Sequence, residues 1–214
     1  MTTHKQPQGL YDPRHERDGC GIGAIVNIRG DRTHTVIRQA INILQNLRHR
    51  GAQGYDPQTG DGAGIITQKP HELLAEIMQG QGISLPAPDD YAVGMVFMPP
   101  DEHSQQVIFD AFVAQCERVG LEWIGCRAVP VDPSVLGEEA ASVQPSVFQI
   151  FVGRGSAQDQ LAFNRSLYLA RRLTEKAVAK QFDGDGSSLH VASLSSQTIV
   201  SVSYTHLRAH ETRE

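Results

Sequence analysis

The chain has 214 residues, of which 40% are hydrophobic and 20% charged, enough apolar material for one large domain or two small ones. Its formal net charge of -5 gives no broad basic field, so we do not expect nucleic acid as a partner. No stretch is long and apolar enough to span a membrane, and residues 1–19 lack the apolar core of a signal peptide. The three cysteines, Cys20, Cys116 and Cys126, do not build a disulfide scaffold and fit a reducing, cytoplasmic compartment.

The first element in the chain is an apolar run that begins at Cys20. The glycines on both sides of this residue, Gly19 and Gly21, leave its sulfur open to a substrate. The run over residues 22–26 predicts a buried strand that would hold the sulfur in place. Free cysteine also commonly packs as a small hydrophobic residue, so both interpretations are open at this point.

The rest of the chain alternates between helical and strand patterns. Apolar residues at spacings of three and four predict a helix over residues 33–47. Further helices are expected to begin at Pro70, with the proline at the first helical position, and to cover residues 104–119 and 159–179. Strands are expected over residues 65–67, 91–98, 121–129, 146–152 and 189–200. We expect Cys116 to lie on the core face of its helix and Cys126 to lie within a strand. The alternation predicts a layered domain of sheets and helices.

A nucleophilic Cys20 would need a base, because the thiolate is the reactive form. Three histidines, His15, His34 and His49, are candidates, although none has an identifying spacing. The alternative base is the α-amino group of Cys20 itself, whose usual pKa of about 7.7–8.0 suits this role. That alternative requires residues 1–19 to be a propeptide, cut after Gly19.

Two further places could serve such a site. Arg50, followed by Gly51, could bind a carboxylate or orient the chain end that carries Cys20, or it could be a solvated cation at a helix end. The glycine-rich segment 60–64 lacks the pattern of a phosphate loop and leads into a strand rather than a helix. It predicts a tight turn near Cys20. No histidine or cysteine pair has the spacing of metal ligands, so no metal is expected.

Four segments, residues 20–23, 47–52, 59–65 and 191–200, together resemble the N-terminal part of the large subunit of glutamate synthase. The resemblance covers roughly residues 12 to 200. It implies an α+β fold of the N-terminal-nucleophile hydrolase type, a four-layer αββα sandwich of largely antiparallel sheets. It also implies a class II glutamine amidotransferase domain.

The resemblance also implies roles for individual residues. Cys20 would become the first residue, attack the side-chain amide of glutamine and release ammonia, with its own α-amine as base and then acid. Arg50 matches the family's arginine near the nucleophile and, with Gly51, would help to bind the substrate. The structural turns near the site would contain Gly21, Gly60, Asp61 and Gly62.

For the whole enzyme, the resemblance implies that ammonia adds to 2-oxoglutarate to give glutamate. FMN and an iron–sulfur cluster are expected in the full-length protein, with no cofactor in this segment. The implied partners are L-glutamine, the remaining domains of the large subunit and a small reductase subunit, whereas the electron donor stays open. The alternatives are another class II amidotransferase, serving sugar or purine synthesis, and an inactive fragment. The turn at 60–65 and the long segment 91–152 favour glutamate synthase.

The end of the chain departs from the family pattern. The family's arginine for the substrate carboxylate, its Asn-Gly oxyanion pair and its aspartate for the α-amine are expected beyond this chain, which predicts a truncated, incomplete domain. Residues 201–214 are polar and rich in histidine and arginine, and they resemble translated sequencing-adapter read-through. A natural divergent terminus is the alternative. We therefore expect a leader over residues 1–19, a partial amidotransferase domain over 20–200 and a non-family tail over 201–214.

Overall fold

The computed structural model describes residues 21–47, 62–182 and 188–203. The chain divides into two compact units, Met1–Ala52 and Gln53–Glu214, which are described separately below. In the described residues no helix is both long enough and apolar enough to cross a bilayer.

Within residues 21–47 the first unit forms one helix, α1 (His34–Asn46), which confirms the helix predicted there. Thr33 precedes it in an extended conformation, and the chain reaches it through a turn in which Gly30 N–H donates to Asn27 O at 3.0 Å. Gly30 adopts a φ of 77°, a conformation that glycine tolerates and most other residues avoid.

The predicted buried strand over residues 22–26 is wrong. The segment forms no strand, and the side chains of Ile22 and Val26 are 86% and 80% exposed. A strand exists only where a neighbouring strand accepts its backbone hydrogen bonds, and the described residues of the first unit include no strand. The apolar composition alone could not supply that partner.

The described residues of the second unit form two antiparallel sheets. Four strands form one sheet in the order β3-β4-β2-β5, and two strands form the other in the order β1-β6. Their bounds are β1 (Ala63–Gln68), β2 (Tyr91–Met98), β3 (Glu122–Ala128), β4 (Ser146–Gly153), β5 (His190–Ser195) and β6 (Thr198–Ser203). Every pairing in this part of the chain is antiparallel, as the family resemblance implied.

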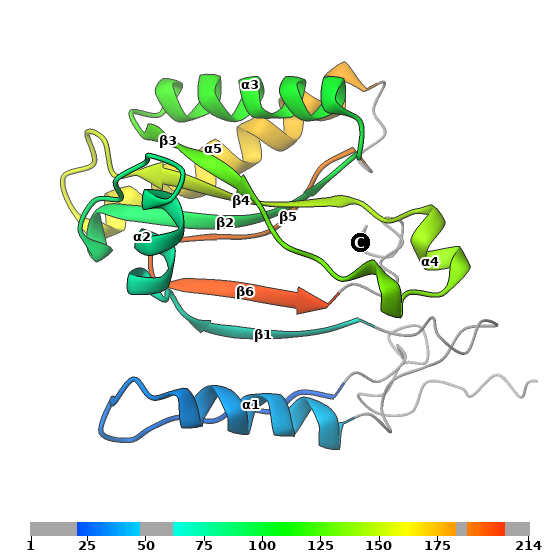
Figure 1. The fold of residues 1–214 in the computed structure, drawn as a ribbon. Coiled ribbons are helices and arrows are strands. Elements are labelled where there is room, and N and C mark those ends of the chain that lie inside the picture. The colour runs from blue at the N-terminus through cyan, green and yellow to red at the C-terminus, as the bar shows by residue number, and fades with distance from the viewer. Residues whose placement is uncertain (1–20, 48–61, 183–187, 204–214) are drawn as a thin grey trace, which may run out of the picture. The chain divides into compact units, whose positions relative to one another are not determined.

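Helices cover one face of the four-stranded sheet. The long helices α3 (Glu102–Arg118) and α5 (Gln160–Gln181) lie together on that face, while β1 and β6 lie on the opposite side (Figure 1). The shorter helix α2 (His71–Gln79) packs Leu74 and Met78 beside β6. The second unit therefore shows three successive layers, α, β and β, of the expected αββα sandwich.

Strand β2 shows why the layers hold together, because all eight of its residues are buried. Val96 and Met98 pack among residues of α3 and α5, including Phe112. Tyr91 and Val93 face the other way, toward α2 and β6. Alternate residues of a strand point to opposite faces, so a strand covered on both sides reads as continuously apolar.

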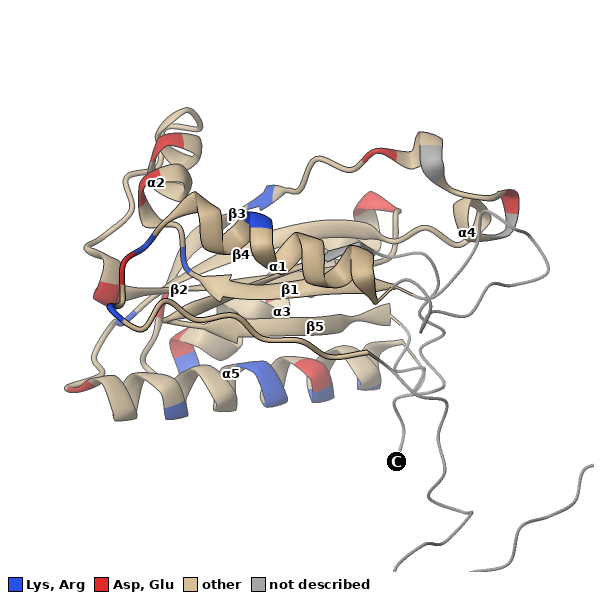
Figure 2. Ribbon diagram, turned by 90° about the horizontal axis from the view of Figure 1, so that it is seen from below, with Lys and Arg blue, Asp and Glu red and all other residues tan. Residues whose placement is uncertain are grey.

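The long helices begin where their sequences place caps. The Asp101 carboxylate accepts from Ser104 N–H at 2.8 Å, and the Asp159 carboxylate accepts from Ala162 N–H at 2.7 Å. Pro70 precedes α2 as its cap residue instead of taking the predicted first helical position. The charged residues of α5 are mostly basic, with Glu175 as the one acidic residue among Arg165, Arg171, Arg172, Lys176 and Lys180 (Figure 2).

The predicted strand over residues 189–200 is also wrong, because it is two strands in different sheets. The chain leaves β5 at Ser195 and enters β6 at Thr198. The Ser195 hydroxyl accepts from the N–H groups of Gln197 and Thr198, both at 3.2 Å, and so stabilises the corner. Strand β6 continues through Ser203, into the segment predicted as a tail, and residues 204–214 lie outside the described residues.

Three short elements were not predicted. They are the 3-10 turns Pro88–Asp90 and Pro133–Val135 and the short helix α4 (Glu138–Ser142). The turn Pro88–Asp90 leads directly into β2. Its carbonyl groups accept hydrogen bonds from the side chains of Lys69 and Arg154.

Candidate functional site

Most of the predicted site residues, namely Cys20, Arg50, Gly51, Gly60 and Asp61, lie outside the described residues. Their roles remain predictions. Of the three candidate histidine bases, His34 is described and is the exposed first residue of α1, whereas His15 and His49 are outside the described part. Gly21 and Gly62 are described.

The glycines that follow Cys20 have a packing role that sequence reasoning missed. A Cβ atom built on Gly23 would lie 2.3 Å from Cγ2 of Ile43, and one built on Gly21 would lie 2.9 Å from Cδ2 of Leu47. Both partners are at the C-terminal end of the α1 region. The helix therefore approaches the backbone of the segment after Cys20 so closely that Gly23 leaves no room for a side chain. From the sequence we interpreted Gly21, with Gly19, only as access to sulfur, and we gave Gly23 no role of its own.

The glycine-rich turn enters a strand, as predicted. Gly62 is exposed and directly precedes β1, which continues to Gln68. No helix begins there, so the segment does not offer the helix N-terminus on which phosphate loops depend. The position of Gly62 is consequently set by how β1 pairs with β6.

The opposite end of β1 is held by Lys69, a buried cation that the sequence did not single out. Lys69 is 7% exposed, and its ammonium donates to Pro88 O at 2.6 Å and to Tyr91 O at 2.5 Å. It also lies 3.6 Å from the centroid of the Tyr91 ring. Burial lowers the pKa of Lys69 to about 8, although the carboxylates of Asp89 and Asp90 oppose this effect.

A second polar network secures the corner between β5 and β6. The Gln160 side-chain amide donates to the Ser196 hydroxyl at 2.6 Å, and that hydroxyl donates to Asn164 Oδ1 at 2.8 Å. Arg154 donates to Gln160 Oε1 at 2.8 Å and forms an ion pair with Asp90 at 3.1 Å. The family-like segment at residues 191–200 thus makes the crossing from one sheet to the other.

The two described cysteines are not activated nucleophiles. Cys116 is fully buried in the core, as predicted, and burial raises the pKa of its thiol to about 12. Cys126 lies in β3, as predicted, and burial also raises its thiol pKa. A raised pKa keeps a thiol protonated and unreactive near neutral pH. Within the described residues, no group of three or more His, Cys, Asp or Glu side chains could hold a metal ion.

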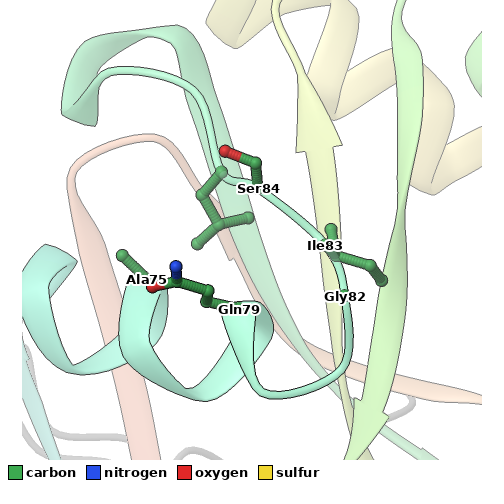
Figure 3. A pocket seen from close by; sticks show the side chains of 6 residues that line it. Ala75, Gln79, Gly82, Ile83 and Ser84 are labelled. Atoms are coloured by element: carbon green, nitrogen blue, oxygen red, sulfur yellow. The ribbon is translucent and has the colours of Figure 1, made fainter.

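Two surface hollows in the second unit contain none of the predicted site residues. One, of about 280 Å³, lies between α2 and the loop after it, where Gln79 and Ser84 supply the polar side chains (Figure 3). The other, of about 410 Å³, lies on α5 beside Arg165 and Tyr168. Neither hollow points to a particular chemistry.

Comparison with known proteins identifies the class of domain. The family described as glutamine amidotransferases class-II matches residues 20–209. The chain is 39% identical over 203 residues to the glutamate synthase [NADPH] large chain of Bacillus subtilis, covering 94% of this chain and 13% of that protein. It is 40% identical over 188 residues to the ferredoxin-dependent glutamate synthase 2 of Synechocystis, covering 86% of this chain and 11% of that protein.

A third relative, the glutamate synthase [NADH] of Schizosaccharomyces pombe, is 35% identical over 199 residues, which are 90% of this chain and 9% of that protein. The chain therefore spans about a tenth of the length of these relatives. The family match extends over most of the chain and covers part of each of the two units. Together with the antiparallel αββ layers, it establishes that this chain belongs to the class II glutamine amidotransferases, which have the N-terminal-nucleophile hydrolase fold.

Proposed function

We propose that this chain is the glutaminase part of a glutamate synthase, which releases ammonia from L-glutamine. One observation carries the proposal most directly: the match to the family begins at residue 20, the cysteine that was selected as the nucleophile. The similarity to glutamate synthase large chains favours this enzyme over other class II amidotransferases.

The proposed reaction needs Cys20 to be the first residue. After removal of residues 1–19, the free α-amine takes the thiol proton, and Sγ attacks the side-chain amide carbon of glutamine. The C–N bond then breaks, the amine returns its proton to the departing nitrogen, and ammonia leaves a γ-glutamyl thioester. Water hydrolyses this thioester to glutamate and restores the thiol.

The other predicted residues would support this chemistry. Arg50, with Gly51, would help to bind and position the substrate, since a guanidinium can hold a carboxylate through two parallel hydrogen bonds. Gly21, Gly60, Asp61 and Gly62 would form the turns beside the nucleophile. The described structure contributes the base on which the last turn rests, because Gly62 leads directly into β1.

In the whole protein, the ammonia would be transferred to 2-oxoglutarate, forming glutamate as part of nitrogen assimilation in the cytoplasm. FMN and an iron–sulfur cluster would supply the redox chemistry there, with a small reductase subunit as a further partner. Thiolates are the ligands of iron–sulfur clusters, and the protonated Cys116 and Cys126 do not fit that role. The iron–sulfur cluster would therefore bind through other residues of the protein.

The test combines mass spectrometry with a glutaminase assay on the full-length protein. We expect an N-terminus at Cys20, and we expect Cys20→Ala to abolish the release of ammonia from glutamine. Cys126→Ser is the matched control and should keep the wild-type rate. A protein that retains residues 1–19 and still hydrolyses glutamine at full rate would overturn the mechanism. Ammonia transfer that requires an acceptor other than 2-oxoglutarate would overturn the assignment to glutamate synthase.

A further inference from the structure

Lys69 connects the two sheets of the second unit at one of their ends. Its backbone N–H donates to Gln197 O at 2.9 Å, directly before the start of β6. Its ammonium donates to Pro88 O at 2.6 Å and to Tyr91 O at 2.5 Å, where β2 begins. Because Lys69 directly follows β1, this residue links the two-stranded sheet to the four-stranded sheet.

Arg154 continues the connection from the turn before β2 to the helix layer. Its backbone N–H donates to Asp90 O at 2.8 Å, and its guanidinium donates to Asp89 O at 2.7 Å. The same guanidinium donates to Gln160 Oε1 at 2.8 Å, in the first turn of α5. Arg154 directly follows β4, so it joins the four-stranded sheet to a helix that covers it.

Ser196 closes the path at the corner between β5 and β6. The Gln160 side-chain amide donates to the Ser196 hydroxyl at 2.6 Å, and this hydroxyl donates to Asn164 Oδ1 at 2.8 Å. Ser196 is buried and directly precedes Gln197, whose carbonyl accepts from Lys69. The hydrogen bonds therefore form a closed ring, which passes through the helix layer and both sheets.

The antiparallel registers bring these groups to the same end of the layers. Gln68 lies opposite Thr198, so the end of β1 is beside the start of β6 (Figure 1). Tyr91 lies opposite Gly153, so the start of β2 is beside the end of β4. Every member of the ring belongs to the second unit.

Two features of the ring favour cooperative behaviour. Gln160 and Ser196 each donate one hydrogen bond and accept another, and bonds connected in this way strengthen one another. A buried polar group that loses its partner also costs free energy, so a break at one member weakens the next. In the described part of the chain no hydrogen bond joins Lys69 to Gln160 directly, yet each is expected to depend on the other through the ring.

We propose that this ring acts as a single cooperative clamp, which couples the first turn of α5 to the end of β1 and holds the helix layer and the two sheets in one arrangement. A disturbance at Gln160 is thereby transmitted to Lys69. The clamp stands on contacts within the second unit and does not require the glutaminase activity.

Hydrogen exchange in the full-length protein tests the coupling at the backbone amide of residue 69, which mass spectrometry with electron-transfer fragmentation can resolve. We expect Gln160→Leu, which removes the amide bridge between Arg154 and Ser196, to speed this exchange about tenfold. Arg165→Leu, at an exposed position on the same helix, is the matched control and should change the rate less than about twofold. The Val129 N–H, which donates to Val147 O outside the ring, is the reference for any general loss of stability.

A double-mutant cycle tests the cooperativity itself. Lys69→Met keeps the backbone amide that is measured but removes the ammonium bonds, so the ring is already open in this variant. Gln160→Leu should then speed exchange at residue 69 less than about twofold. If Lys69→Met does not fold, Ser196→Ala replaces it, because it opens the ring at another position.

Two results would overturn the clamp. The first is an unchanged exchange rate at residue 69 when Gln160→Leu is made in the otherwise native protein. The second is an equal effect of Gln160→Leu in the native and the Lys69→Met backgrounds, because independent hydrogen bonds contribute additively.

Discussion

Replacing Lys69 by methionine is expected to change how the stability of the protein depends on pH. Lys69 is 7% exposed, and its ammonium has a pKa of about 8, against 10.5 for an ordinary lysine. Below pH 8 both the folded and the unfolded chain hold this proton, and the cost of burying the charge is fully present. Between pH 8 and 10.5 the folded chain releases the proton while the unfolded chain keeps it. The free energy of unfolding therefore rises with pH in this window.

The size of the effect follows from the difference between the two pKa values. A difference of about 2.5 corresponds to about 3 kcal/mol in total, of which about 2.5 kcal/mol is gained between pH 7 and pH 10. At pH 7 the methionine variant loses two hydrogen bonds but also the desolvation cost, so the difference in stability there is expected to be smaller than at pH 10.

The assay is urea unfolding of both proteins at several values between pH 7 and pH 10. Cys116 and Tyr91 also contribute to the pH dependence in this range. Burial raises their pKa values to about 12 in the folded chain, whereas the unfolded chain begins to release these protons at lower pH. Both proteins contain those groups, so the difference between the two curves isolates Lys69. We expect wild type to gain about 2.5 kcal/mol relative to Lys69→Met. A difference that stays constant across the range would refute the reasoning that this ammonium is buried at a cost.

Three further predictions concern the core and the first unit. Between pH 8 and pH 10 the free energy of unfolding of wild type should fall by about 1.4 kcal/mol, because only the unfolded chain forms the Cys116 thiolate in this range. Cys116→Val should remove this fall. Equal falls in urea titrations of both proteins would contradict the prediction. Phe112→Ala should lower the free energy of unfolding by about 3–5 kcal/mol, because this ring is fully buried and stacks on Trp123. Leu161→Ala, at an exposed position, should change it by no more than about 0.5 kcal/mol. A similar loss for both variants in urea unfolding would contradict the core described here. Gly23→Ala should destabilise the first unit by about 1–3 kcal/mol, because its methyl group would collide with Ile43, whose branched side chain has little rotamer freedom in a helix. Hydrogen exchange of the α1 amides should show faster opening in Gly23→Ala and recovery when Ile43→Ala is added, and no recovery would exclude the collision as the cause.

The helices and the buried strands could be predicted from the sequence because their signals are local. The helix predicted over residues 159–179 is observed at Gln160–Gln181, and its start is marked by the cap of Asp159. Strand β2 is observed with the predicted bounds, because a continuous apolar run that stops at Pro99 has few other interpretations. The three glycine- and cysteine-containing segments predicted the class of domain through their order and spacing, and the family match confirms it.

The wrong predictions share a cause, which is that strands depend on partners distant in the sequence. Residues 22–26 have the composition of a strand, yet the described residues of the first unit include none. The run 189–200 contains no glycine or proline, so nothing local marked the corner where Ser195 caps a turn with its side chain.

The sequence by itself determined the family, the alternation of helices and strands and the candidate nucleophile, because short motifs and periodic patterns are properties of neighbouring residues. Only the tertiary structure decided that β5 and β6 belong to different sheets and that Lys69 connects these two sheets. A lysine before a proline is an ordinary surface residue in a sequence. It becomes a structural element here because folding brings the carbonyl groups of Pro88 and Tyr91, about twenty positions away in the chain, to its ammonium.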